Sequence, residues 1–184
     1  GYVSGPNPLY NGLQQLQGGE FLLYTKENRE VSLERYCTFF SENTLEGSEE
    51  ELLHEADIRH ERAFAKMVQA LDGRQACVLL SGGLDSRLIL GFLKEHKYDN
   101  VVTATYGKQG LWEIKVAKAV AEKAGVPWSY VGSKPDAVKD HLYSKEGYDY
   151  FRFASGLASI PFVTENYAFS VLRSEKRLAE DCVI

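Results

Sequence analysis

The chain has 184 residues, of which 44% are hydrophobic and 26% charged, as expected for a globular chain with one core of ordinary size. Its formal net charge of -5 indicates no extended basic surface for a nucleic acid, and no apolar run approaches the ~20 residues of a membrane span. The three cysteines are far apart, which argues against a disulfide framework or a zinc site. We therefore expect a soluble, cytoplasmic chain that binds neither nucleic acid nor membrane.

The first predicted elements are two short strands. Residues Glu20–Tyr24 and Val31–Tyr36 read as short strands on either side of a polar turn, which predicts a β-hairpin. The polar stretch Ser41–Glu51 that follows is the best linker in the chain, and Ser48 with Glu51 matches a helix capping box. A second domain is therefore expected to begin in this stretch.

A long amphipathic helix is predicted after the linker. Apolar side chains recur at helical spacing from Leu52 to Leu71, whereas Glu55, Arg59 and Lys66 fall on the opposite side. We expect the apolar side of this helix to pack on a sheet.

The most informative segment is a glycine turn between an apolar run, Ala76–Leu80, and a helical stretch, Arg87–Glu95. It consists of Ser81, Gly82, Gly83, Leu84, Asp85 and Ser86. The first N–H groups of a helix have no intrahelical partner and lie at the positive end of its dipole, so such a junction favours an anion. The glycines allow close approach, the serines carry hydroxyl donors, and Asp85 is a candidate Mg²⁺ ligand. The segment is therefore predicted to bind pyrophosphate.

The alternative is that Ser-Gly-Gly is only a turn and that Asp85 or Ser86 is an N-cap without a ligand. That alternative explains each residue singly, but not the coincidence of all of them between a strand and a helix. The kinase-type phosphate loop is also excluded, because no lysine follows Gly83 before Lys94.

Residues 81–86 resemble the signature of the PP-loop ATP pyrophosphatases, which cleave ATP between its α and β phosphates and pass adenylate to an acceptor. Residues 1–40, with Gly-Pro-Asn-Pro at 5–8, look like the end of the glutaminase-type domain of glutamine-hydrolysing asparagine synthetases. Residues 103–131 are similar to the second strand, the helix and the third strand of their synthetase domain. The chain thus resembles the asparagine synthase family.

This resemblance implies a division of the chain. Residues 1–42 are the end of a glutaminase-like domain, a β-hairpin remnant, and residues 43–184 are a PP-loop synthetase domain truncated at its C-terminus. The chain begins Gly1-Tyr2, where the complete relatives have a terminal cysteine nucleophile, and it stops at Ile184, before a further Mg²⁺ and pyrophosphate segment of the relatives. We expect a fragment that is itself inactive.

Strand and helix alternate after the loop, with a strand at 101–106, a helix at 111–124 and a strand at 128–131. This order predicts an α/β fold with a parallel twisted sheet, helices on both faces and ligands at the carboxyl ends of the strands. The resemblance makes Leu80, Thr105, Tyr106 and Gly107 candidate adenine or ribose contacts. The alternative, which is equally consistent with the sequence, is that these four residues only pack within the sheet and contact no ligand.

Two further features bear on the site. Glu113 lies in the first turn of its helix, where the dipole alone favours an acid, but the resemblance makes it a candidate site acid. Aromatic residues are dense between Ala137 and Phe153 without a clear period, so they either line an acceptor pocket or cover the core. The segment 159–173 is predicted to be a helix, and Asp181–Ile184 to begin a strand.

The resemblance implies an ATP-dependent carbon–nitrogen ligase. It would use ATP and Mg²⁺ to activate a substrate carboxylate as an acyl-adenylate, release pyrophosphate and amidate the acid with ammonia from glutamine. Asparagine biosynthesis is the expected role. A sugar acid or a lactam precursor is the alternative acceptor, and a catalytically silent nucleotide-binding or structural domain is the alternative class. No residue is assigned to catalysis itself, and a homodimer is one assembly that the resemblance allows.

Overall fold

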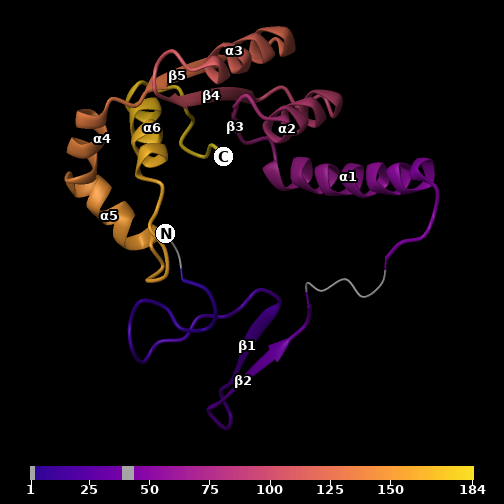
Figure 1. The fold of residues 1–184 in the computed structure, drawn as a ribbon, viewed down its shortest axis with the longest axis vertical. Coiled ribbons are helices and arrows are strands. Elements are labelled where there is room, and N and C mark those ends of the chain that lie inside the picture. The colour runs from indigo at the N-terminus through magenta and orange to yellow at the C-terminus, as the bar shows by residue number, and fades with distance from the viewer. Residues whose placement is uncertain (1–2, 39–43) are drawn as a thin grey trace.

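A computed structural model describes residues 3–38 and 44–184 (Figure 1). A hairpin comes first, and strands and helices then alternate through an α/β part. The strands are β1 (Glu20–Thr25), β2 (Glu30–Arg35), β3 (Ala76–Leu79), β4 (Val101–Gly107) and β5 (Trp128–Gly132). The helices are α1 (Glu49–Leu71), α2 (Leu84–Glu95), α3 (Trp112–Ala124), α4 (Pro135–Leu142), α5 (Lys145–Ala154) and α6 (Val163–Ser174). None of these described helices is long and apolar enough to cross a membrane.

The α/β part is built on a parallel sheet in the order β3-β4-β5. The last residue of β3, Leu79, pairs with Ala104, and β4 and β5 end together at the pair of Gly107 and Gly132. Val183 forms an isolated parallel bridge with Ala76 on the free side of β3, where the sequence predicts the start of a strand. The predicted α/β fold with a small preceding hairpin is confirmed.

Helices cover both faces of this sheet, and each face has its own core. On one face, Leu90 and Leu93 of α2 pack with Ala117 and Ala121 of α3. On the other face, Ala168 and Leu172 of α6 pack with Cys77, Ala104 and Val131 of the strands. Burial on both faces explains why the strands are continuous apolar runs in the sequence.

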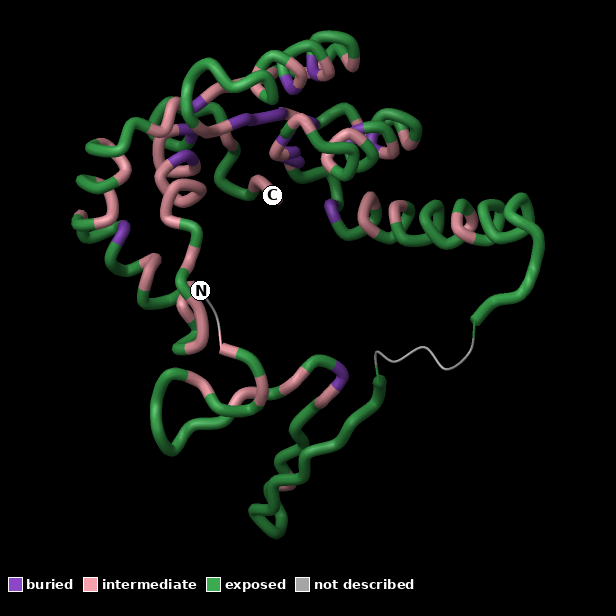
Figure 2. The backbone as a smooth tube through the Cα atoms, viewed as in Figure 1, coloured by how far each residue is buried: buried purple, intermediate pink, exposed green. Residues whose placement is uncertain are grey.

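Helix α1 packs over only part of its length, which corrects the expectation that its whole apolar side lies on the sheet. Phe64 stacks on Phe92 of α2 with ring centroids 4.0 Å apart, and Met67, Val68 and Leu71 reach the core. The earlier turns, including Leu53, extend into solvent, as Figures 1 and 2 show. The capping box is as predicted, because Ser48 accepts the Glu51 N–H and Glu51 accepts the Ser48 N–H.

The dense aromatic segment folds as two helices, α4 and α5, which periodicity does not predict. Ser144 caps α5 by accepting the N–H of Gly147, and Gly147 lies so close to α4 that a Cβ there would be 2.1 Å from the His141 carbonyl oxygen. The helix predicted at 159–173 begins later, at Val163. Tyr148 and Phe153 are 59% and 89% exposed, so these two aromatic side chains neither cover the core nor line an enclosed pocket.

The hairpin β1–β2 is antiparallel, and one side of it pairs Leu22 with Leu33 and Tyr24 with Val31. All four side chains are at least half exposed, as the green hairpin in Figure 2 shows. The predicted boundary between residues 42 and 43 falls within 39–43, outside the described residues. The division into two domains therefore stays a prediction.

Candidate functional site

Residues 81–86 form a closed turn directly after β3. The Ser81 N–H donates to Ser86 Oγ at 3.2 Å, and the Gly83 N–H donates to Ser81 Oγ at 3.1 Å. The two serine hydroxyls lie 3.4 Å apart. The hydroxyls of both serines therefore fix the shape of the turn by accepting its backbone N–H groups.

Helix α2 begins without a side-chain cap. Its N-cap is Gly83, so neither Asp85 nor Ser86 fills that position, which rules out the alternative that one of them is the N-cap. Arg87 donates from Nη2 to the Gly82 carbonyl oxygen at 2.7 Å and from Nε to the Gly83 carbonyl oxygen at 2.9 Å. The turn thus combines uncapped helical amides with a guanidinium that engages its outward-facing carbonyl oxygens, an environment that favours an anion.

Gly82 lies against the start of α3. A Cβ at this position would be 2.8 Å from Cη2 of Trp112 and 3.0 Å from Cγ of Glu113, so a side chain there would collide with both. The N-cap of α3 is Leu111, which also provides no side-chain hydrogen bond. Two uncapped helix starts therefore meet at the glycine turn.

A cavity of about 250 Å³ opens beside this junction, at the carboxyl ends of β3 and β4. Five of the predicted site residues line it, and the structure thereby brings them together: Leu80, Ser81, Thr105, Tyr106 and Glu113. The remaining lining residues are Leu79, Ala104, Leu111 and Ile114. The cavity lies where ligands of parallel sheets bind.

Several predicted contacts have their polar groups already engaged. Thr105 Oγ1 donates to the Leu80 carbonyl oxygen at 2.9 Å and accepts the Trp128 Nε1 hydrogen at 3.0 Å. The Gly107 carbonyl oxygen accepts the Tyr130 hydroxyl at 2.8 Å, and the Leu80 side chain is only 2% exposed. These residues fix the strand ends, and Leu80 and Thr105 also line the cavity, whereas Gly107 is not among its lining residues.

Tyr106 reaches the other face of the sheet. Its hydroxyl donates to a carboxylate oxygen of Glu165, in the first turn of α6, at 3.1 Å. Burial, and then the Glu165 charge, raise the pKa of Tyr106 to about 12. The same two causes raise the pKa of Tyr150 on α5. This contact ties α6 to the carboxyl end of β4.

Asp85 and Leu84 lie apart from the cavity. Both are exposed and line a shallow hollow along α2, together with Arg87, Leu88 and residues further along the helix. Within residues 3–38 and 44–184, no group of three or more His, Cys, Asp or Glu side chains is arranged to hold a metal ion. Asp85 therefore offers a single carboxylate beside the turn.

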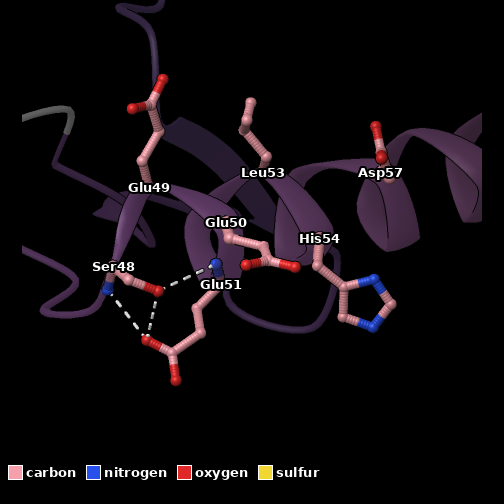
Figure 3. A pocket seen from close by; sticks show the side chains of 7 residues that line it. All are labelled: Ser48, Glu49, Glu50, Glu51, Leu53, His54 and Asp57. Atoms are coloured by element: carbon pink, nitrogen blue, oxygen red, sulfur yellow. Dashed lines mark hydrogen bonds between the residues drawn. The ribbon is translucent and has the colours of Figure 1, made fainter.

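A larger hollow at the start of α1 is unrelated to this junction. It is lined by acidic residues of the first helical turn and by His54 and Asp57. Figure 3 shows that Glu51 turns back to Ser48 while Glu49 points elsewhere, so these carboxylates do not converge. Acids in a first turn are explained by the helix dipole.

Two residues of the junction, Trp112 and Arg87, are absent from the predicted site, and so is Ser133 beyond it. Ser133 follows β5, and its hydroxyl is buried without a hydrogen-bond partner among the described residues. Arg87 directly follows the predicted turn in the sequence, and its position in the first turn of the predicted helix could have identified it as a neighbour of the turn. Nothing in the spacing marks Trp112 or Ser133.

Comparison with known proteins agrees with the sequence resemblance. Residues 60–145, a little under half of the chain, match a family model described as asparagine synthase. A curated relative, a 7-cyano-7-deazaguanine synthase from Staphylococcus saprophyticus, is 43% identical over 60 residues, which are 32% of this chain and 26% of that protein. The chain thus spans about a quarter of the relative's length.

A solved structure, an NH3-dependent NAD synthetase from Campylobacter jejuni in complex with nitrate, has a TM-score of 0.42 and 13% sequence identity. The similarity covers 67% of this chain and 52% of that one. The family match covers β3, the glycine turn, α2, β4, α3 and β5, and therefore the whole junction described above. Residues 60–145 are accordingly similar to the asparagine synthase family.

Proposed function

We propose that this chain is the nucleotide-binding part of an ATP-dependent amide-forming ligase of the asparagine synthetase type. The observation that carries the proposal is the junction itself. An uncapped glycine turn and a cavity lie side by side at the carboxyl ends of two parallel strands. A nucleotide needs this pairing, because its phosphates require donors and its base requires an enclosed wall.

The phosphates are assigned to the turn at residues 81–86. Gly83 leaves the first amides of α2 without a side-chain cap, and they lie at the positive end of the helix dipole. Arg87 adds a positive charge and occupies the carbonyl oxygens of Gly82 and Gly83, which would otherwise repel an anion. In this proposal, Ser81 and Ser86 hold the amides in position.

Magnesium is assigned to Asp85. Mg²⁺ in nucleotide sites is commonly held by one or two carboxylates together with phosphate oxygens and waters, so a single exposed carboxylate beside the turn suits it. Asp85 lies in the first turn of α2, two residues after the N-cap. The ion would neutralise the phosphate oxygens.

The base and ribose are assigned to the cavity wall formed by Leu80, Thr105 and Tyr106, and to Gly107 at the end of β4. Because the Thr105 hydroxyl donates to Leu80 and accepts from Trp128, its role is to hold two strand ends at a fixed separation. Glu113 borders the same cavity and is the remaining charged group in its lining.

The proposed chemistry begins when a carboxylate oxygen of the acceptor attacks the α-phosphorus of ATP. A bond forms between that oxygen and phosphorus, and the bond to the pyrophosphate oxygen breaks. Ammonia, supplied from glutamine, then attacks the acyl carbon and AMP leaves with the bonding electrons. The chain contributes positioning and charge neutralisation at the turn.

The acceptor belongs to the same proposal. Aspartate is the acceptor of the asparagine synthetases that the sequence resembles, and a sugar acid or a lactam precursor is the alternative. A catalytically silent nucleotide-binding domain is the alternative class.

The products of ATP cleavage test this function. The full-length protein that contains this chain, in its wild-type form and as the variants below, is incubated with Mg-ATP, glutamine or ammonium, and a panel of carboxylic acids. Nucleotide and phosphate products are then separated. We expect AMP and pyrophosphate, formed only with the correct acid. Release of ADP and phosphate would contradict the proposal.

A matched pair of variants localises the activity. Asp85→Ala removes an exposed acid from the first turn of α2, and Glu95→Ala removes an exposed acid from its last residue. We expect AMP formation to fall with Asp85→Ala and to persist with Glu95→Ala. Mg-ATP bound by both variants without any AMP formation in the wild type would favour the silent domain.

A further inference from the structure

The glycine turn has an unusual neighbour, the indole of Trp112. Trp112 is the first residue of α3 and is 63% exposed, although tryptophan is usually largely buried in soluble proteins. The outer edge of its ring, atoms Cη2 and Cζ3, lies 2.8 and 3.1 Å from where a Cβ of Gly82 would be. One edge of the ring therefore packs on the turn while most of the ring is in contact with solvent.

The sequence neighbours of Trp112 line the cavity, although Trp112 itself does not. Leu111 and Glu113, on either side of Trp112, both line the cavity, as does Ile114 one residue further on. Leu84, within the turn segment itself, is 75% exposed. Two large apolar side chains, Trp112 and Leu84, are thus exposed at or beside the turn.

This arrangement has a consequence for binding. An aromatic ring next to an anion-binding turn provides a stacking surface for a planar base whose phosphates occupy the turn, and such stacking depends on the ring face rather than on hydrogen bonds. The Leu80 side chain is buried and the Thr105 hydroxyl is already hydrogen-bonded, so in the proposed site they form a wall beside the base but provide no ring on which it can stack. The exposed indole is the large apolar surface that remains open there.

We propose that Trp112 is a base-contacting residue that stacks on the nucleobase of the bound nucleotide and favours purine nucleotides. The proposal rests on the proposed function, because it needs the phosphates at residues 81–86. It also gives Gly82 a second role, since a larger residue there would displace the ring. Trp112 acts in binding and takes no part in bond formation.

Tryptophan fluorescence gives a direct test, because the chain has two tryptophans. Trp128→Phe leaves Trp112 as the single emitter. We expect Mg-ATP to quench or shift this emission, and Mg-pyrophosphate, which has no base, to leave it nearly unchanged. Mg-CTP should produce a smaller change than Mg-ATP, because a pyrimidine offers less stacking area.

Affinity provides the second readout. Calorimetry should give a dissociation constant for Mg-ATP about tenfold higher in Trp112→Leu than in the wild type, with the constant for Mg-pyrophosphate unchanged. Trp112→Phe should recover most of the affinity. Phe153→Leu, which removes an 89% exposed ring on α5, is the matched control and should bind Mg-ATP as the wild type does.

The outcomes separate the two proposals. If the wild type and Trp112→Leu bind Mg-ATP equally and the Trp112 emission does not respond, the stacking role is wrong while nucleotide binding stands. If the wild type binds neither Mg-ATP nor Mg-pyrophosphate, the proposed function fails and the stacking role fails with it. Thermal melts of the variants confirm that each is folded.

Discussion

The hairpin β1–β2 and the sheet β3-β4-β5 are both built from short strands, but the two are buried to very different extents. Every residue of β2 is exposed, whereas three of the four residues of β3 are buried. The sheet has helices on both faces, and the hairpin has none within the described residues. The comparison teaches that forming strands does not by itself produce a buried sheet. The candidate site lies on the sheet β3-β4-β5, which is buried on both faces.

Cysteine reactivity should show the largest difference between the two regions. Cys37, shortly after β2, is exposed, whereas Cys77 in β3 is 3% exposed and burial raises its pKa to about 12. In variants that keep one cysteine each, Cys37 should react with a thiol reagent at pH 8 at least ~10³-fold faster, because Cys77 reacts only after the core opens. Similar rates would mean that the reagent reaches Cys77 in the sheet as easily as Cys37 beside the hairpin.

Core truncation is the next largest effect. Leu90→Ala removes a 2% exposed side chain from α2 and should lower the free energy of unfolding by about 2–5 kcal/mol. The matched change in the hairpin, Leu33→Ala at 60% exposure, should cost about 0.5 kcal/mol or less. Urea titrations followed by circular dichroism measure both. An equal cost would show that the hairpin is buried against something in solution.

Gly82→Ala tests the packing of the turn against α3. The new methyl group would collide with Trp112 and Glu113, so we expect a loss of about 1–3 kcal/mol in the free energy of unfolding. Adding Trp112→Ala should restore part of that loss, since the ring is then gone. Additive losses in the double variant would contradict the contact between Gly82 and the indole.

The contact between Tyr106 and Glu165 should give the smallest effect, confined to high pH. The folded-state pKa of Tyr106, about 12, lies above its ordinary value of 10.0, so the stabilisation is fully present below pH 10 and is lost as the pH rises through about 12. The free energy of unfolding of the wild type should therefore fall more steeply in that window than that of Tyr106→Phe. Parallel curves would mean that the hydroxyl is not held by the carboxylate.

Sequence patterns predict the sheet well, because burial on both faces leaves continuous apolar runs such as Ala76–Leu80. They predict the glycine turn for a related reason, since Gly82 and Gly83 stand between a strand and a helix. Periodicity also identifies the apolar stripe of α1, but it does not tell whether a partner covers Leu53. That is why the free first half of the helix was not predicted.

Other features depend on contacts distant in the sequence. Helices α4 and α5 were missed because their aromatic residues mask the helical period. Their packing relies on Gly147, which lies close to His141 only in the folded structure. Trp112 likewise becomes informative only once the structure places Gly82 at the edge of its ring. The bond between Tyr106 and Glu165 joins residues 59 positions apart, which no local pattern encodes.

The position of the bound phosphates tests the central claim most directly. Backbone amide resonances of the ¹⁵N-labelled protein are followed by NMR during titration with Mg-ATP. We predict the largest shifts at residues 82–86, with the resonances of β1 and β2 unchanged. If the amide resonances of Gly82 and Gly83 do not shift, or if the largest shifts occur in the hairpin, the assignment of this turn as the phosphate-binding site is contradicted.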